Sequence, residues 1–123
     1  MRGPDHKQSS LFSYTNIEDR IAADHPLRRV KVMADMVLHS MSPTFDSLYA
    51  EGGRPSIAPE RLLRALLLQC LFSIRSERAL IEHLDFNMMF RWFVGLSQDE
   101  PVWDHSSFSA NRDRLFKESV MRE

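Results

Sequence analysis

The sequence predicts an all-α fold, a compact domain of several helices in a chain of 123 residues. Apolar residues recur at steps of three and four in successive segments, which is the spacing of one helix face. Glycine is scarce, with 4 residues, and runs of β-branched residues are absent, so a sheet is disfavoured. The hydrophobic fraction of 43% and charged fraction of 27% are those of an ordinary globular domain.

The predicted domain follows a stretch without periodicity. Residues 1–23 are predicted to form a loose N-terminal arm, with one short helical turn at 16–22. Asp24 as a cap and Pro26 in the first turn then indicate a helix over 26–41, which carries one apolar stripe. The helical domain is expected to span 24–118, followed by a short tail at 119–123.

The most apolar helix is predicted in the middle of the chain. Ser42 starts a short element that Gly52 and Gly53 end. Pro59 then opens a helix over 59–74 that has almost no polar face, so we expect it to lie centrally in the core. On this interpretation Leu66→Asp prevents folding.

Short helices are predicted to follow. Ser76 can cap a helix over 76–84, and an aromatic-rich helix over 88–94 ends at Gly95. An acidic loop leads to a last helix that reaches about Glu118 and is capped by Asp104, Ser106 or Ser107. The C-terminal part therefore resembles a helix-turn-helix arrangement, in which earlier short helices support the last one.

Charge and cysteine content restrict the class of protein. The net charge is −1, but residues 52–80 carry five arginines against two acids, so a local basic face is possible. Cys70 is the single cysteine, lies in an apolar run and is predicted to be a buried core thiol. No signal peptide and no span of ~20 apolar residues is visible, which predicts a soluble cytoplasmic protein without a membrane partner.

The last helix offers a candidate surface for DNA. At about 100° per residue, Phe108, Leu115 and Phe116 fall toward one side. The opposite side carries polar side chains that can bind base edges or phosphates, and these are the predicted DNA-binding residues: Ser107, Asn111, Arg114 and Lys117. Arg112 lies nearer the apolar side and is assigned a packing role.

Two alternatives to this surface stay open. A charged face on a terminal helix is usually only solvated, and a second basic patch occurs at Arg28, Arg29 and Lys31. The helices at 76–84 and 88–94 are an alternative candidate for contacting DNA. We disfavour them because Arg91 is the one basic residue in the aromatic-rich helix at 88–94.

No catalytic or metal-binding residue is assigned. Asp99, Glu100 and Asp104 share one acidic loop, where capping and solvation explain them. The five histidines have no pair at the spacing of a zinc site. We therefore expect no cofactor in this chain.

Three segments carry a resemblance to a known family, and they lie in a stretch from about Asp24 to Phe116. They read GRPSIAPERLLRALLLQ, SERALIEHLDFNMMFRWFVGL and DHSSFSANRDRL. In this order they resemble the N-terminal domain of bacterial insertion-sequence transposases of the insertion-sequence-five group.

The resemblance implies that DNA recognition and catalysis belong to different domains. In such transposases this domain precedes a ribonuclease-H-like core, whose two aspartates and one glutamate bind metal ions, expected to be magnesium. All three carboxylates are expected beyond the last residue of this chain, so the catalytic core is absent and the chain alone is not expected to cut DNA. The N-terminal helices are expected to recognise terminal inverted repeats and to help assemble the complex.

Other functions compete with DNA binding. The chain could pair transposase subunits, as a homo-oligomer or with the full-length enzyme, through the aromatic residues Phe90, Trp92, Phe93 and Trp103. A truncated product could also occupy the ends of the element and inhibit the full-length transposase. A stand-alone enzyme is the least favoured reading.

Overall fold

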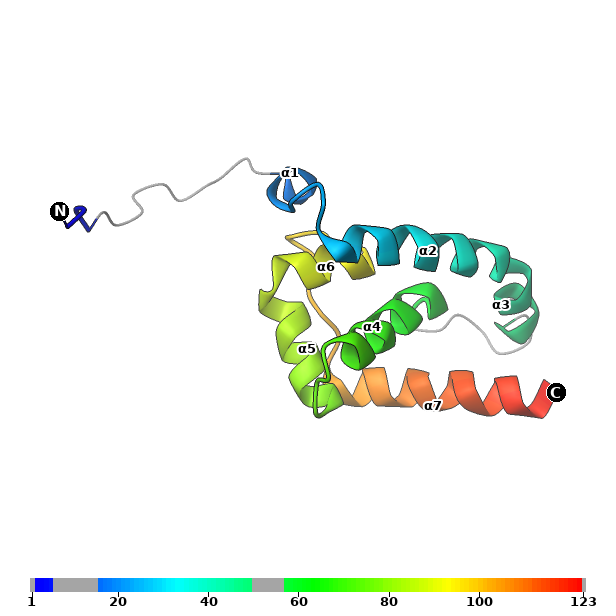
Figure 1. The fold of residues 1–123 in the computed structure, drawn as a ribbon. Coiled ribbons are helices and arrows are strands. Elements are labelled where there is room, and N and C mark those ends of the chain that lie inside the picture. Colours follow the sequence, from blue (N-terminus) through cyan, green and yellow to red (C-terminus); the bar gives the residue numbers. More distant parts are fainter. Residues whose placement is uncertain (1, 6–15, 50–56, 123) are drawn as a thin grey trace.

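Seven α-helices form the described part of the protein. The computed structural model describes residues 2–5, 16–49 and 57–122, and no strand occurs within those ranges. The helices are α1 (Ile17–Arg20), α2 (Pro26–Ser40), α3 (Ser42–Tyr49), α4 (Pro59–Leu71), α5 (Glu77–Phe86), α6 (Met88–Val94) and α7 (His105–Arg122), shown in Figure 1. The predicted all-α fold is confirmed. Residues 1 and 6–15 of the predicted arm, and the predicted stop at Gly52 and Gly53, lie outside the described residues.

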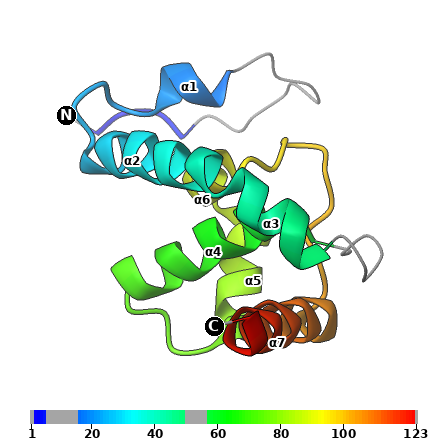
Figure 2. The same cartoon turned by 90° about the vertical axis from the view of Figure 1, so that its right-hand side faces the viewer.

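The helices are stacked around α4. In Figures 1 and 2, α4 lies between α2 on one side and α7 on the other. The short helices α5 and α6 form one end of the molecule, where both contact α4. Helix α1 packs against α6, and α7 packs against α4 and α5. This arrangement leaves one long side of α7 facing away from the other helices.

Local signals in the sequence set the ends of the C-terminal helices. The Ser76 hydroxyl accepts a hydrogen bond from the backbone N–H of Ala79 at 3.1 Å, so the predicted cap of α5 is confirmed. Asn87 both ends α5 and starts α6, because its side-chain oxygen accepts from the N–H of Phe90 at 3.1 Å. Gly95 ends α6 with a φ of 100°, a left-handed conformation that glycine adopts without strain.

The start of α2 differs from the prediction. His25, rather than Asp24, is the capping residue, because its Nδ1 accepts from the backbone N–H of Leu27 at 3.1 Å. Arg28 in the first turn of α2 donates to the carbonyl oxygen of Ile21 at 2.7 Å. The last part of the predicted arm is therefore tied to α2 by side-chain hydrogen bonds.

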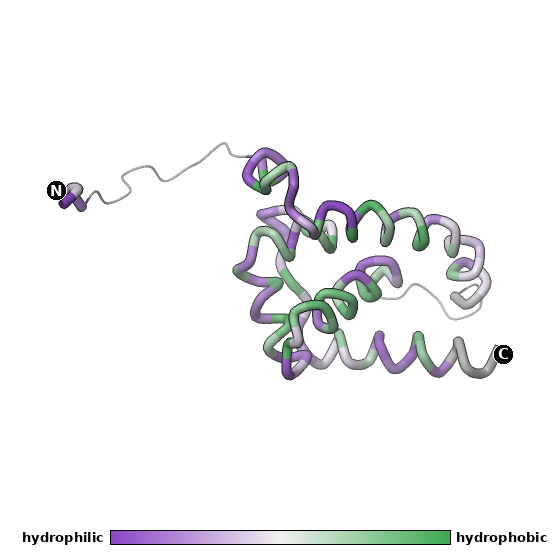
Figure 3. The backbone as a smooth tube through the Cα atoms, viewed as in Figure 1, coloured by the Kyte–Doolittle hydropathy of each residue, from purple (hydrophilic) through white to green (hydrophobic). Residues whose placement is uncertain are grey.

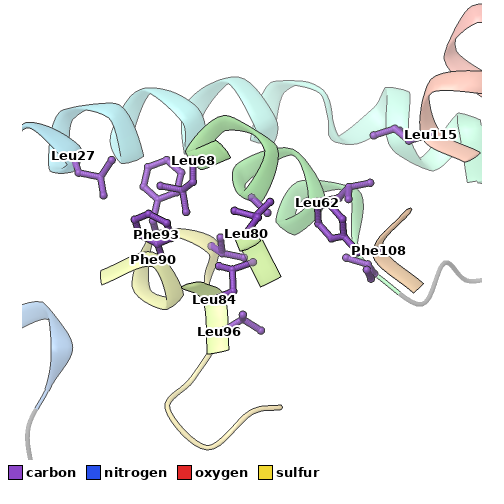
Figure 4. Close-up of a cluster of buried hydrophobic side chains, with 13 residues drawn as sticks. Leu27, Leu62, Leu68, Leu80, Leu84, Phe90, Phe93, Leu96, Phe108 and Leu115 are labelled. Carbon is purple, nitrogen blue, oxygen red and sulfur yellow. The ribbon is translucent and has the colours of Figure 1, made fainter. Parts of the chain in front are cut away.

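One hydrophobic core joins α2, α4, α5, α6 and α7 (Figure 4). Its members come from all five helices and from the segments that flank α4 and α6. They are Leu27, Ile57, Leu62, Ala65, Leu68, Leu80, Leu84, Phe90, Phe93, Val94, Leu96, Phe108 and Leu115. Burying this apolar surface is the main force that holds the helices together.

Helix α4 is buried along one face only. Leu62 and Leu68 are 1% and 0% exposed, while Leu66 is half-buried and Cys70 is exposed. Phe72, just after the end of α4, is 45% exposed. The prediction of a core thiol at Cys70 is therefore wrong, the apolar residues around α4 do not all face the core, and the helix ends at Leu71 rather than at about 74. An aspartate at position 68 is expected to be more damaging than one at position 66.

A buried guanidinium connects α5, α6 and the loop that follows. Arg91 in α6 is 5% exposed. Its Nη1 donates to the carbonyl oxygens of Leu84 at 2.9 Å and Asp85 at 3.4 Å, in the last turn of α5. Its Nη2 donates to the carbonyl oxygens of Ser97, at 2.6 Å, and Glu100. One side chain thus satisfies four carbonyl groups and fixes the course of the loop toward α7.

Candidate nucleic-acid interface

The face that α7 turns toward the core differs from the predicted one. Phe108 and Leu115 are 0% and 4% exposed, as expected, but Phe116 is 50% exposed. Asn111 lies between the two buried residues and is only 9% exposed. The expectation that Asn111 faces outward is therefore wrong. Counting Phe116 in the apolar stripe turned the expected inner face away from Asn111, because each residue rotates the helix by about 100°.

Asn111 is used inside the fold. Its side-chain oxygen accepts a hydrogen bond from the backbone N–H of Ile57 at 3.3 Å, and its amide nitrogen donates to the carbonyl oxygen of Ser107 at 2.8 Å. Ile57 is 2% exposed and precedes α4, so its N–H has no access to water. Asn111 thereby joins α7 to the start of α4.

We expect Asn111→Ala to destabilise the protein by about 1–3 kcal/mol, because the buried N–H of Ile57 then has no acceptor. Urea denaturation followed by circular dichroism measures the change. Lys117→Ala, on the exposed side of the same helix, serves as the matched control and is expected to stay within about 0.5 kcal/mol of the parent. Equal stabilities of the two variants would contradict this role of Asn111.

The other predicted DNA-binding residues lie on two parts of α7. Ser107 and Arg114 are half-buried and share a flank with Asn111, since they are four and three positions away from it. Arg114 also interacts within the chain. Lys117 is exposed on the outward side. The structure thus brings Ser107, Asn111 and Arg114 together and leaves Lys117 apart, on the accessible face.

Arg112 connects α7 to α5. Its guanidinium donates to the carboxylate of Glu77 through Nη1 and to that of Asp113 through Nη2, at 2.9 Å in the second case. Asp113 raises the pKa of Arg112, partial burial opposes this, and Glu77 adds to it. The hydroxyl of Ser109 donates to Glu77 at 2.9 Å. The negative charge of Glu77 is therefore neutralised by Arg112. These contacts fix the first turn of α5 beside the middle of α7.

Two further arginines lie at this junction. Arg75 and Arg78 flank Glu77 in the sequence, are exposed, and form no ion pair with any residue in the described ranges. They are not among the predicted DNA-binding residues, although the excess of arginine in residues 52–80 indicates a basic face in this part of the chain. We group these two arginines with Lys117, the exposed cation of α7, and call the three residues the α5–α7 surface: Arg75, Arg78 and Lys117.

Acidic residues, rather than basic ones, precede the first turn of α7. Asp104 caps the helix by accepting from the N–H of Ser107 at 2.7 Å, which lowers the pKa of its carboxyl group. Glu100, in the preceding loop, pairs with Arg61, and this hydrogen bond lowers the pKa of Glu100. Negative charge already occupies the helix N-terminus, so this end of α7 is a poor site for a phosphate.

No group of three or more histidine, cysteine, aspartate or glutamate side chains in the described part of the chain is arranged to hold a metal ion. No helix within those same ranges is long and apolar enough to cross a membrane.

Residues 15–114 match the protein family described as Transposase domain (DUF772). The chain belongs to this family. The match covers the described helices α1 to α6 and the first half of α7. Membership links the protein to transposition. No curated protein and no solved structure matches the chain.

The aromatic residues proposed as interface anchors of this transposase domain are mostly internal. Phe90 and Phe93 are 3% and 0% exposed and belong to the core, so their assignment as anchors is wrong. Trp103 is half-buried, and its ring lies 6.2 Å from that of Phe108. Helix α6 contacts α4, and its phenylalanine side chains are buried in the core between the helices. This packing explains the aromatic content of α6.

The second basic patch of the transposase domain is also mostly engaged. The guanidinium carbon of Arg28 and the ammonium nitrogen of Lys31 lie 5.4 and 5.5 Å from the ring centre of Trp92. Arg28 pairs with Glu18 at 2.8 Å, which lowers the pKa of that carboxyl group, and Lys31 pairs with Asp35 at 2.8 Å. These cations hold α2 to its neighbours, so this patch is a weaker candidate for DNA than the α5–α7 surface.

Proposed function

We propose that this chain is the DNA-binding and assembly domain of an insertion-sequence transposase of the insertion-sequence-five group, and that it recognises the terminal inverted repeats of its element. The observation that carries the proposal is the match of residues 15–114 to a transposase domain family. The exposed cations of the α5–α7 surface support it, since phosphate contacts supply most of the affinity for DNA.

The proposed contact uses the middle of α7 and the start of α5. Arg75, Arg78 and Lys117 are exposed, and we propose that they contact phosphates, while Arg112 is held in ion pairs with Glu77 and Asp113. The acids around Asp104 repel the duplex from the first turn of α7 and so direct it toward the later turns. In this arrangement α7 faces a groove of the DNA duplex, and α5 and α6 support α7 as the first helix supports the second in a helix-turn-helix.

We further propose that strand cleavage belongs to a ribonuclease-H-like catalytic domain with magnesium, and that this chain contributes binding and assembly in the cytoplasm. Asp104 and Glu100, the acids at the start of α7 and in the loop before it, are engaged in capping and in an ion pair. They therefore serve the fold, as do Glu77 and Asp113, which lie at the proposed surface itself and pair with Arg112. A chain that binds ends without cutting would inhibit the full-length transposase by competing for them.

A salt titration tests the proposal. Binding of the purified chain to a terminal-repeat duplex is followed by fluorescence anisotropy at increasing salt concentration. Each phosphate contact contributes about −0.9 to the slope of log K against log salt. The double variant Arg75→Ala, Arg78→Ala is therefore expected to reduce the slope by about 2, and Lys117→Ala by about 1.

Arg20→Ala is the matched control, because Arg20 is an exposed cation on α1, far from α7 in Figure 1. Its slope should equal that of the parent. A scrambled duplex of the same length should bind more weakly than the terminal repeat. Identical slopes in all variants would contradict the proposed site. Equal affinity for the two duplexes would contradict the proposed recognition of the terminal repeat.

A further inference from the structure

A group of aromatic rings lies where α4, α5 and α6 contact one another, and two of its members are open to solvent. Phe72 directly follows α4 and is 45% exposed, while Phe86 at the end of α5 is 78% exposed. The tube of Figure 3 shows hydrophobic and hydrophilic bands alternating along α5 at this end of the molecule. Large apolar side chains that gather on a surface are typical of interaction sites.

The rings form one connected group that rests on the core. The ring centre of Phe90 lies 5.0 Å from that of Phe72 and 5.3 Å from that of His83. Phe90 is 3% exposed, so it supports these two rings from beneath. Phe86 lies three positions after His83, on the same side of α5. The exposed rings are therefore positioned by the fold before any partner binds.

A hollow of about 360 Å³ lies against Phe86. Its lining combines aromatic and polar side chains: Ala79, Glu82, His83, Phe86 and Asn87. The volume is within the range of small-molecule sites. The hollow thus offers room for a flat group, a ring on which that group can stack, and polar atoms that can bind its edge.

Two exposed arginines accompany the rings. Arg75 follows Phe72 by three positions, in the turn that joins α4 to α5. Arg78 lies two helical turns before Phe86 on the same side of α5, which is a distance of about 12 Å along the helix. Aromatic rings beside arginines are the combination that binds single-stranded nucleic acids, because bases stack on the rings and phosphates pair with the cations. A purely apolar partner would leave both arginines without a counter-charge.

We propose that this surface binds an unpaired DNA strand, with bases stacked on Phe72 and Phe86 and the backbone at Arg75 and Arg78. The site shares these two arginines with the α5–α7 surface, so it rests on the proposed function. Bases inside a duplex have both faces covered by neighbouring base pairs, and an aromatic ring can stack only on a base that has left the duplex. The strand bound here is therefore one that is frayed or separated from its complement.

The acids of α5 determine how the strand lies. Glu82 and Asp85 are both exposed and repel phosphates from the second half of α5, so the backbone stays near Arg75 and Arg78. Glu82 also lines the hollow beside Phe86, where its carboxylate can accept a hydrogen bond from the edge of a base. Cytosine offers an amino group for this contact, whereas thymine presents a carbonyl oxygen in the same position. The hollow should therefore prefer cytosine to thymine.

Fluorescence anisotropy with a short single-stranded oligonucleotide of mixed sequence tests this inference. Phe86→Ala should weaken single-strand binding by about fivefold or more, and should leave the affinity for the terminal-repeat duplex unchanged. Phe86→Trp should retain single-strand binding because it keeps a ring, whereas Phe86→Leu should lose it although it stays apolar. Met36→Ala is the matched control, because Met36 is 68% exposed on α2 and carries no ring. Oligo-dC should bind more tightly than oligo-dT, and Glu82→Ala should remove the difference.

The two kinds of DNA separate this inference from the proposed function. A parent chain that binds the duplex but not the oligonucleotide, or equal single-strand affinities of Phe86→Ala and the parent, would overturn the inference and leave recognition of the terminal repeats standing. An equal loss of affinity for both DNAs in Phe86→Ala would overturn it as well. If the rings served a protein contact, sedimentation velocity would show self-association that Phe86→Ala removes and the oligonucleotide does not affect, which would also overturn it. Equal binding of oligo-dC and oligo-dT would contradict the place of the base beside Glu82.

Discussion

Arg91→Met is expected to lower the free energy of unfolding by about 4 kcal/mol, because four charge-assisted hydrogen bonds to carbonyl groups disappear at once. Arg91 is 5% exposed, so water does not replace the lost donors. Two of the four carbonyls belong to Leu84 and Asp85 in the last turn of α5, where the helix dipole also favours a cation. The other two, of Ser97 and Glu100, fix the loop that leads to α7.

Urea denaturation measures this change, and Arg91→Lys separates charge from geometry. A lysine keeps the charge but has one donor group at the end of a flexible chain, so it cannot bridge α5 and the loop as the guanidinium fork does. We expect Arg91→Lys to recover less than half of the lost stability. If the free energies of unfolding of both variants were within about 0.5 kcal/mol of the parent, the hydrogen bonds of Arg91 would not stabilise the fold.

Phe93→Ala is expected to destabilise the protein by about 3–5 kcal/mol, since it removes a fully buried ring and leaves a cavity. Phe93 is 0% exposed and belongs to the core cluster that joins α4, α6 and α7 (Figure 4). Phe86→Ala is the matched control, because Phe86 is 78% exposed and should change the stability by less than about 0.5 kcal/mol. Calorimetric melting of the two variants compares them directly, and equal melting temperatures would contradict the assigned core.

Most helix limits could be predicted because they depend on neighbouring residues. The cap at Ser76, the stop at Gly95 and the start at Pro59 each act within one turn, and the structure confirms all three. The predicted cap of α2 is one residue too early, because Asp24 and His25 both carry a side-chain acceptor and the N–H of Leu27 donates to His25.

The orientation of each helix could not be predicted with the same certainty. Phe116 is exposed and Asn111 is buried, because the N–H of Ile57, 54 residues earlier, needs an acceptor inside the fold. Arg91 is buried for a similar reason, since its four acceptors come from two separated segments. Hydrogen bonds between distant segments leave no periodic signal in the sequence. The proposed DNA surface therefore depends on Arg75, Arg78 and Lys117 rather than on Asn111.

Mapping of backbone amide shifts by nuclear magnetic resonance, during titration with a terminal-repeat duplex, tests the proposed DNA surface most directly. We expect the largest changes in amide chemical shift in residues 75–78, at the start of α5, and in residues 112–117 of α7. Amides of α1 and of the exposed face of α2 should change little. Shifts centred on α2, or no shifts at a duplex concentration that saturates the anisotropy, would contradict the α5–α7 surface as the place where this transposase domain binds DNA.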